Sequence, residues 1–201
     1  INSYTLQALV RQAGGEGMLY GIAPDNKQKM AEMVARAHRE CDMVVVTAGS
    51  SASVRDLTAM VIDELGQPGV LVHGVNVRPG KPTILGVCDG KPVVGLPGNP
   101  VSALVIASLF VTPLIEGMLG KQKGPISAQR EAVLKVNLAS QAGREDWVAV
   151  QLIEEDGEWF ADPVFGKSNL IFTLVRADGL VRIPADANGL AAGSRVDVYR
   201  L

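Results

Sequence analysis

The strongest constraint on the fold of this chain is the unbroken apolar run at residues 42–47, Asp-Met-Val-Val-Val-Thr. A strand that is apolar on both faces is typical of a parallel sheet with helices packed on either side. Before this run, apolar residues from Met30 to Cys41 recur at helical spacing, after the helix-start signal Asp25-Asn26. The alternation of helix and buried strand predicts an α/β domain with a mostly parallel sheet.

The same alternation continues to about residue 119. We expect helices at 6–13, 30–41, 59–65 and from 101 onward, and strands at 18–22, 42–47, 70–75, 84–88 and 93–96. Beyond a polar stretch at 120–127, strand-like segments dominate, at 132–138, 147–153, 159–163, 180–183 and 195–199. These segments predict a small β-barrel or sandwich. We therefore place a first domain at residues 1–122 and an all-β domain at 123–201.

Composition argues against several classes of partner. The net charge is −2, no run of Lys or Arg occurs and aromatics make up only 4%, so we expect no nucleic-acid partner. The apolar stretch 101–119 approaches the length of a membrane span, but it contains Ser102, Pro113 and Glu116. We interpret it as a buried helix and expect no membrane partner. The two cysteines stand alone in apolar surroundings, which favours reduced core residues of a cytoplasmic protein.

Two Pro/Gly turns indicate an anion site. Residues 78–82, Arg-Pro-Gly-Lys-Pro, present two cations from a stiff backbone, which suits an oxyanion, although a solvated charged turn is the alternative. Residues 95–100, Gly-Leu-Pro-Gly-Asn-Pro, follow a strand and lead into a helix, with Asn99 as the natural N-cap and Pro100 as the first helical residue. Backbone N–H groups at such a helix start bind anions.

A third loop, small and polar, follows the buried apolar strand. Gly49 allows close approach of the backbone to a ligand, and Ser50 and Ser51 offer donors, unless the loop is an ordinary connection with a serine N-cap. Asp56, near the start of the next helix, and Asp25 have two interpretations. They are either helix-start acids or carboxylates that hold Mg²⁺ beside a phosphate.

Several of these motifs resemble one known family. RPGKP, GLPGNPVSA and LFVTPLIEGMLG, with RADGLVRIP and GLAAGSRVDVY near the C-terminus, resemble the molybdopterin molybdenumtransferases, the MoeA family that includes the E domain of gephyrin. The resemblance covers essentially the whole chain. It implies a MogA-like molybdopterin-binding domain that lacks its first strand, followed by a small β-barrel domain. Because the chain also begins with Ile, we expect a part of a longer protein that is inactive by itself.

The family inserts molybdate into adenylylated molybdopterin and releases AMP. The resemblance therefore implies these two substrates, Mg²⁺ as cofactor, a homodimer in the cytoplasm and a MogA-type adenylyltransferase partner. A rival interpretation is a non-catalytic molybdopterin-binding or scaffolding module.

Carried over residue by residue, the resemblance assigns catalytic roles and binding roles. The catalytic set is Asp25, Asp56, Lys81, Pro97 and Pro100, and the two acids would hold Mg²⁺. The binding set is Arg78, Lys81, Pro82, Asn99, Ser102, Arg144 and Ser168, joined by the loop residues Gly49, Ser50 and Ser51. Within this set, the resemblance places the turn at 78–82 on the molybdate side and has Arg144 and Ser168 complete the molybdate pocket. One departure concerns the family loop GGVSVG, which is replaced here by AGSSASVRD at residues 48–56. Either a divergent subfamily keeps the same chemistry, or pterin binding is altered.

Overall fold

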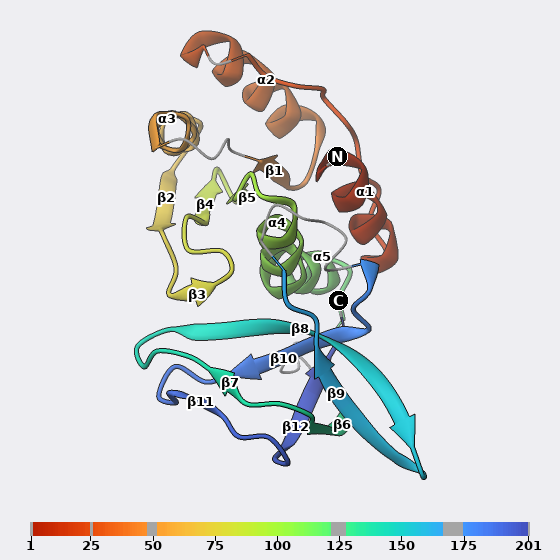
Figure 1. Cartoon of the computed structure of the whole chain (residues 1–201). Coiled ribbons are helices and arrows are strands. Elements are labelled where there is room, and N and C mark those ends of the chain that lie inside the picture. The colour runs from red at the N-terminus through yellow and green to blue at the C-terminus, as the bar shows by residue number, and fades with distance from the viewer. Residues whose placement is uncertain (1, 25, 48–51, 122–127, 167–174, 201) are drawn as a thin grey trace. The chain divides into compact units, whose positions relative to one another are not determined.

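The structure is a computed structural model, and it describes residues 2–24, 26–47, 52–121, 128–166 and 175–200. The chain forms two compact units, whose elements are labelled in Figure 1. Unit 1 contains Ile1–Val75 and Gly80–Leu119, and unit 2 contains Asn76–Pro79 and Gly120–Leu201. The boundary that we expect between residues 122 and 123 lies outside the described residues and stays a prediction. From the sequence we expect Asn76–Pro79 in the first domain, whereas the structure places this segment in unit 2.

Unit 1 is built on a mixed four-stranded sheet. Its strands are β1 (Val44–Thr47), β5 (Lys91–Leu96), β4 (Ile84–Cys88) and β2 (Pro68–His73), in the order β1-β5-β4-β2. The α/β class is confirmed, but the expectation of a mostly parallel sheet is wrong for the described strands. Only β1 and β5 run parallel, whereas β4 is antiparallel to both of its neighbours. The reason is the tight turn Asp89-Gly90, whose φ values of +48° and +83° suit a two-residue hairpin.

Three helices precede or interleave with these strands: α1 (Asn2–Ala13), α2 (Lys27–Glu40) and α3 (Ala52–Asp63). The helix predicted after Asn26 is confirmed, because the Asn26 side chain accepts a hydrogen bond from the Lys29 backbone N–H at 3.0 Å. Its buried face, Met30, Val34 and Ala37, packs in one hydrophobic core with residues of α3, β1, β4 and β5. The periodicity in the sequence therefore identified the face that is buried.

A longer helical run follows β5 as α4 (Pro100–Ile106), η1 (Ala107–Val111) and α5 (Thr112–Met118). Its middle part, η1, is a π-helical turn just before Pro113, which has no N–H to donate to the carbonyl of Leu109. By length and composition, Pro100–Met118 is the one described helix that could cross a membrane, with 19 residues and a mean hydropathy of 1.9. Core helices have the same composition. The expected buried helix is buried along one face, where Ile106, Ala107 and Val111 lie in the core, and 44% of the apolar window is buried.

The strand expected at residues 18–22 is absent from the structure, which has no regular element there. Gly21 adopts a positive φ of +89°, which interrupts an extended strand. The carbonyl of Gly17 accepts a hydrogen bond from the Gln7 side chain of α1 at 2.7 Å instead of joining a ladder. The apolar side chains Met18 and Ile22 are consequently exposed.

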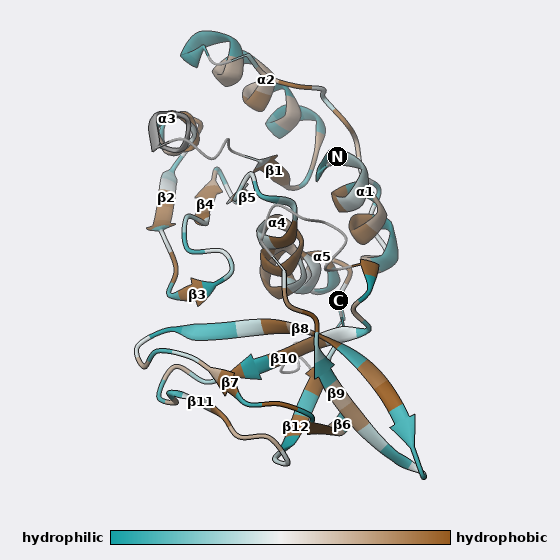
Figure 2. Ribbon diagram, in the orientation of Figure 1, coloured by the Kyte–Doolittle hydropathy of each residue, from teal (hydrophilic) through white to brown (hydrophobic). Residues whose placement is uncertain are grey.

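Unit 2 contains a closed five-stranded barrel, which confirms the barrel expectation. The strands are β6 (Ala128–Leu134), β8 (Glu145–Glu155), β9 (Glu158–Pro163), β10 (Gly179–Ile183) and β12 (Arg195–Tyr199). The order β10-β12-β6-β9-β8 is closed by pairing of β8 with β10. The residues of β12 alternate between solvent and core, with Val196 and Val198 buried. The ribbon of β12 accordingly carries both hydrophilic and hydrophobic segments (Figure 2).

Two short pairings complete unit 2. The strand β7 (Leu138–Ala139) pairs with β11 (Gly189–Leu190). The strand β3 (Val77–Arg78) pairs in parallel with β8, so that Val77 lies opposite Glu145 and Arg78 opposite Asp146. This pairing attaches the short segment Asn76–Pro79 to unit 2.

Candidate functional site

The turn at residues 78–82 is held rigidly by its own backbone. The Val75 N–H donates to the Lys81 carbonyl at 2.9 Å, and the buried Thr83 donates to the Gly80 carbonyl through both its N–H and its hydroxyl. Gly80 has a φ of +135°, and a Cβ at this position would lie 2.3 Å from the buried Ile106 side chain. The stiffness predicted from the Pro/Gly composition is therefore present, with Pro82 half-buried and Lys81 exposed.

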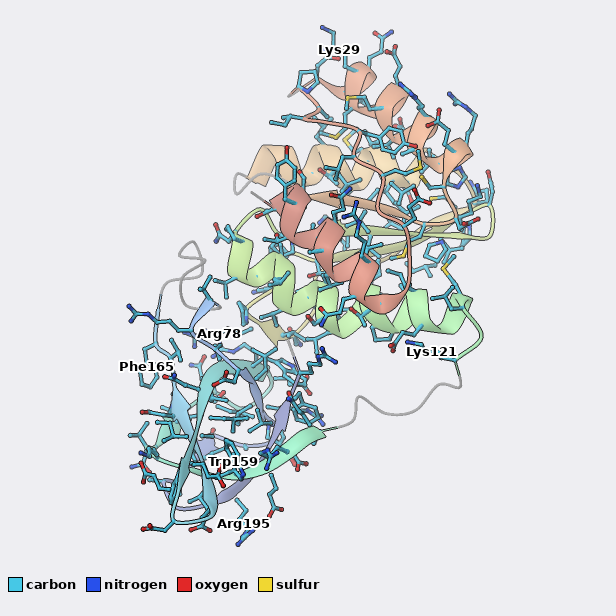
Figure 3. The ribbon with its side chains drawn as sticks, turned by 90° about the vertical axis from the view of Figure 1, so that its right-hand side faces the viewer. Lys29, Arg78, Lys121, Trp159, Phe165 and Arg195 are labelled. Carbon is cyan, nitrogen blue, oxygen red and sulfur yellow. The ribbon has the colours of Figure 1, made fainter. Side chains whose placement is uncertain are left out.

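Arg78 and Arg144 converge on one carboxylate in unit 2. The Arg144 side chain donates from Nε to Oδ1 of Asp146 at 2.6 Å and from Nη2 to Oδ2 at 3.1 Å. The Nη1 atom of Arg78, labelled in Figure 3, lies 3.6 Å from the same Oδ2 atom. The structure thus brings together two residues that the resemblance assigns to molybdate.

Asp146, which is only 5% exposed, is not among the site residues predicted from the sequence. A usable signal exists in the motif Gly-Arg-Glu-Asp at residues 143–146. Residues at positions i and i+2 of an extended segment lie on one face, so a buried strand start with Arg and Asp at this spacing predicts an ion pair.

The residue between them, Glu145, has different partners. Its Oε1 atom accepts from the Trp147 indole N–H and its Oε2 atom from Nε of Arg182, both at 2.7 Å. Trp147 also packs edge-on against Tyr199, with ring centroids 5.1 Å apart. These contacts fix the start of β8, which contains Asp146 and directly follows Arg144.

The second Pro/Gly turn leads into α4 in unit 1. Pro97 is buried, Pro100 is the first residue of α4 and Ser102, two residues further along, is buried. The Asn2 side chain donates to the Gly98 carbonyl at 2.8 Å, which ties the turn to α1. Asn99 occupies the N-cap position, as predicted, but its side chain forms no capping hydrogen bond.

The carboxylates proposed for Mg²⁺ are only partly described. Asp56 is exposed and lies one turn inside α3, which has no acidic residue in its first turn, so its interpretation as a helix-start acid is wrong. Asp25, Gly49, Ser50, Ser51 and Ser168 lie outside the described residues. Across the part of the chain that the structure describes, no group of three or more His, Cys, Asp or Glu residues could hold a metal ion.

A shallow hollow of about 250 Å³ lies elsewhere on unit 2, between β6, β9 and β12. It is lined in part by Trp159 and Arg195, both labelled in Figure 3. Arg195 pairs with Glu131 at 2.6 Å and with Glu158 at 3.7 Å. Two acids surround this one cation, so the local charge is negative, in contrast to the positive charge of the Arg78, Arg144 and Asp146 group.

Both halves of the chain match known domain families. Residues 1–117 match a family described as "Probable molybdopterin binding domain". Residues 131–201 match the family described as "MoeA C-terminal region (domain IV)".

Individual relatives agree with these matches. The chain is 37% identical over 202 residues to a molybdopterin biosynthesis protein of Methanocaldococcus jannaschii, covering 100% of this chain and 46% of the relative. It is 32% identical over 206 residues to molybdopterin molybdenumtransferase 1 of Mycobacterium tuberculosis, covering 98% and 48%. A MoeA structure from Pyrococcus horikoshii superposes with a TM-score of 0.84 at 38% identity, covering 100% of this chain and 47% of that one. The chain thus spans about half the length of the curated relatives it matches.

Proposed function

This chain belongs to the MoeA family of molybdopterin-binding proteins, and from that membership we propose that it serves the insertion of molybdate into adenylylated molybdopterin, with release of AMP. Relatives along the whole chain carry the name molybdopterin molybdenumtransferase. The structural observation that carries the proposal is the convergence of Arg78 and Arg144 on the buried Asp146, which leaves an excess positive charge where the resemblance assigns molybdate.

The chemistry we propose is electrostatic. Molybdate and the phosphoanhydride of the adenylylated pterin are both anionic, and fixed cations stabilise the negative charge that develops as the anhydride is hydrolysed to AMP. Arg78 and Arg144 of unit 2 would supply this positive charge, and the resemblance assigns Lys81 to the same role. The dithiolene of the pterin supplies the sulfur ligands of molybdenum, so the protein needs no thiolate. Cys88 fits this scheme, because burial raises the pKa of its thiol and keeps it protonated.

The proposed test is AMP release from adenylylated molybdopterin in the presence of molybdate, using the natural gene product that contains this chain. We expect Asp56→Ala to slow AMP release on the order of a hundredfold, as the loss of one electrostatic contact to a transition state does. Glu32→Ala is the matched control, since Glu32 is also an exposed acid on a helix and accepts a hydrogen bond from Gln28 of its own helix. Equal rates in all three proteins would contradict a catalytic role for Asp56.

The same assay addresses the rival function, a molybdopterin-binding or scaffolding module without catalysis. That function predicts pterin binding with no AMP release even by the wild-type protein. We also propose Mg²⁺ as a cofactor bound through Asp25 and Asp56, on the resemblance alone. Removal of Mg²⁺ by EDTA should then abolish AMP release and added Mg²⁺ should restore it, and an EDTA-resistant rate would contradict the proposal.

We extend the proposal to the cellular setting of the enzyme. The resemblance supports a homodimer that receives its pterin from a MogA-type adenylyltransferase in the cytoplasm. Free Cys41 and Cys88 are compatible with a reducing compartment. Sedimentation velocity of the natural gene product tests the dimer, and co-purification with the adenylyltransferase tests the partner. A monomer, or no co-purification at micromolar concentration, would contradict these points.

A further inference from the structure

We propose that Asp146 is a positioning residue that holds the guanidinium groups of Arg144 and Arg78 as one clamp for an oxyanion. The inference rests on the proposed function in taking molybdate as that oxyanion. Neither the motifs nor the family comparisons assign a role to Asp146. The positioning role proposed here can be measured through molybdate binding, separately from turnover.

The geometry of the three side chains supports this role. The two contacts from Arg144, at 2.6 and 3.1 Å, join the Nε–Nη2 edge of the guanidinium to both carboxylate oxygens, which fixes the plane of the group. Arg78 approaches Oδ2 from β3 at 3.6 Å. The Asp146 side chain is 7% exposed, whereas those of Arg144 and Arg78 are 30% and 63% exposed. The carboxylate is therefore buried beneath two cations that reach solvent.

The donors and charges of this group suit an anion. An arginine carries five N–H donors, and Asp146 occupies two of those on Arg144, so among the described residues three are left for another acceptor. Two guanidinium groups and one carboxylate leave a net charge of +1. A planar, immobilised guanidinium loses less conformational entropy on binding an oxyanion than a free side chain does.

The backbone positions the same residues independently of the side chains. Parallel pairing of β3 with β8 places Arg78 opposite Asp146, and the Glu145 N–H donates to the Asn76 carbonyl at 2.9 Å. On the other side of β8, Asp146 lies opposite Ile183 of β10. Asp146 thus lies on a strand that is paired on both sides, which is a rigid base for a binding group.

A competing role for Asp146 makes the opposite prediction. If the carboxylate merely neutralised the arginines, it would compete with an incoming anion, and its removal would strengthen anion binding. The positioning role predicts weaker binding, because the two guanidinium groups would have to be ordered by the anion itself. The sign of the change in molybdate affinity therefore separates the two roles.

The experiment is equilibrium dialysis of molybdate against wild-type protein, Asp146→Asn and the control Glu131→Gln, which removes a charge from the exposed ion pair with Arg195 on the same unit. We expect Asp146→Asn to raise the Kd for molybdate about tenfold, with Glu131→Gln unchanged. The Nε–H resonance of Arg144 in an NMR spectrum should show slow solvent exchange in wild type and fast exchange in Asp146→Asn. Unchanged or tighter molybdate binding by Asp146→Asn would overturn the inference.

A second variant keeps the test decisive if Asp146→Asn proves unfolded by circular dichroism. Arg144→Lys keeps the charge but cannot contact both carboxylate oxygens, so it should also weaken molybdate binding about tenfold, and unchanged binding would overturn the inference. No molybdate binding by wild type contradicts the proposed function, whereas wild-type binding that survives in both variants contradicts only the role of Asp146.

Discussion

The substitution Gly80→Ala tests whether the turn between Arg78 and Lys81 requires a residue without a side chain. Gly80 has a φ of +135°, and a Cβ there would lie 2.3 Å from both Cγ1 and Cδ1 of Ile106. Ile106 is completely buried, so its side chain cannot move without displacing neighbouring core atoms. Alanine at this position should therefore lower the stability of the fold in two ways, through a strained backbone and through a clash with Ile106.

The size of each penalty follows from the structure. A non-glycine residue held at a positive φ costs about 1–3 kcal/mol, and overpacking of a well-packed core costs about 1–3 kcal/mol more. We therefore expect Gly80→Ala to lower the free energy of unfolding by about 2–6 kcal/mol. Gly90→Ala is the matched control, because Gly90 has a φ of +83° with no atom within 4 Å of its missing Cβ. It should show the backbone cost alone.

The assay is urea denaturation followed by circular dichroism, with both substitutions repeated in an Ile106→Ala background. Removal of the Ile106 side chain should reduce the cost of Gly80→Ala by about 1–3 kcal/mol and leave the cost of Gly90→Ala unchanged. The reasoning is refuted if Gly80→Ala costs no more than Gly90→Ala, or if its cost is the same in both backgrounds.

Two further predictions concern titratable groups in unit 1. Burial raises the pKa of the Cys88 thiol, so iodoacetamide should modify the half-buried Cys41 well before Cys88, and equal rates by mass spectrometry would contradict this. Hydrogen bonds from Tyr20 and Arg36 lower the pKa of Glu40. These bonds therefore stabilise the folded state fully above the ordinary glutamate pKa of about 4.3, and the stabilisation is lost as pH falls through the lowered pKa of Glu40. Glu40→Gln should therefore flatten the fall of Tm below about pH 4, and a slope equal to that of wild type would count against the contact.

Local signals in the sequence predicted much of the fold. The N-cap at Asn26 and the spacing of Met30, Val34 and Ala37 identified α2 and its buried face, since both depend on neighbours within a few residues. The Asp-Gly pair at residues 89 and 90 was a hairpin signal that the sequence analysis overlooked. Its recognition would have corrected the expectation of a mostly parallel sheet.

The candidate site was harder to predict, because its contacts are distant along the chain. Nothing near Arg78 in the sequence indicates that β3 pairs with β8, which begins at Glu145. Register between remote strands is set by the packing of a whole unit rather than by local residue types. The sequence therefore identified Arg78 through its Pro/Gly turn and Arg144 only through a family resemblance, while the carboxylate that joins them was found in the structure.

The most direct test of the account compares two arginines of the barrel in the AMP-release assay with molybdate. Arg144 shares Asp146 with Arg78, whereas Arg195 is neutralised by two acids on another part of unit 2. We predict that Arg144→Ala slows molybdate-dependent AMP release by about 10²–10³-fold while Arg195→Ala retains the wild-type rate. Full activity of Arg144→Ala, or equal losses in the two variants, would contradict the claim that this cation pair is the oxyanion site.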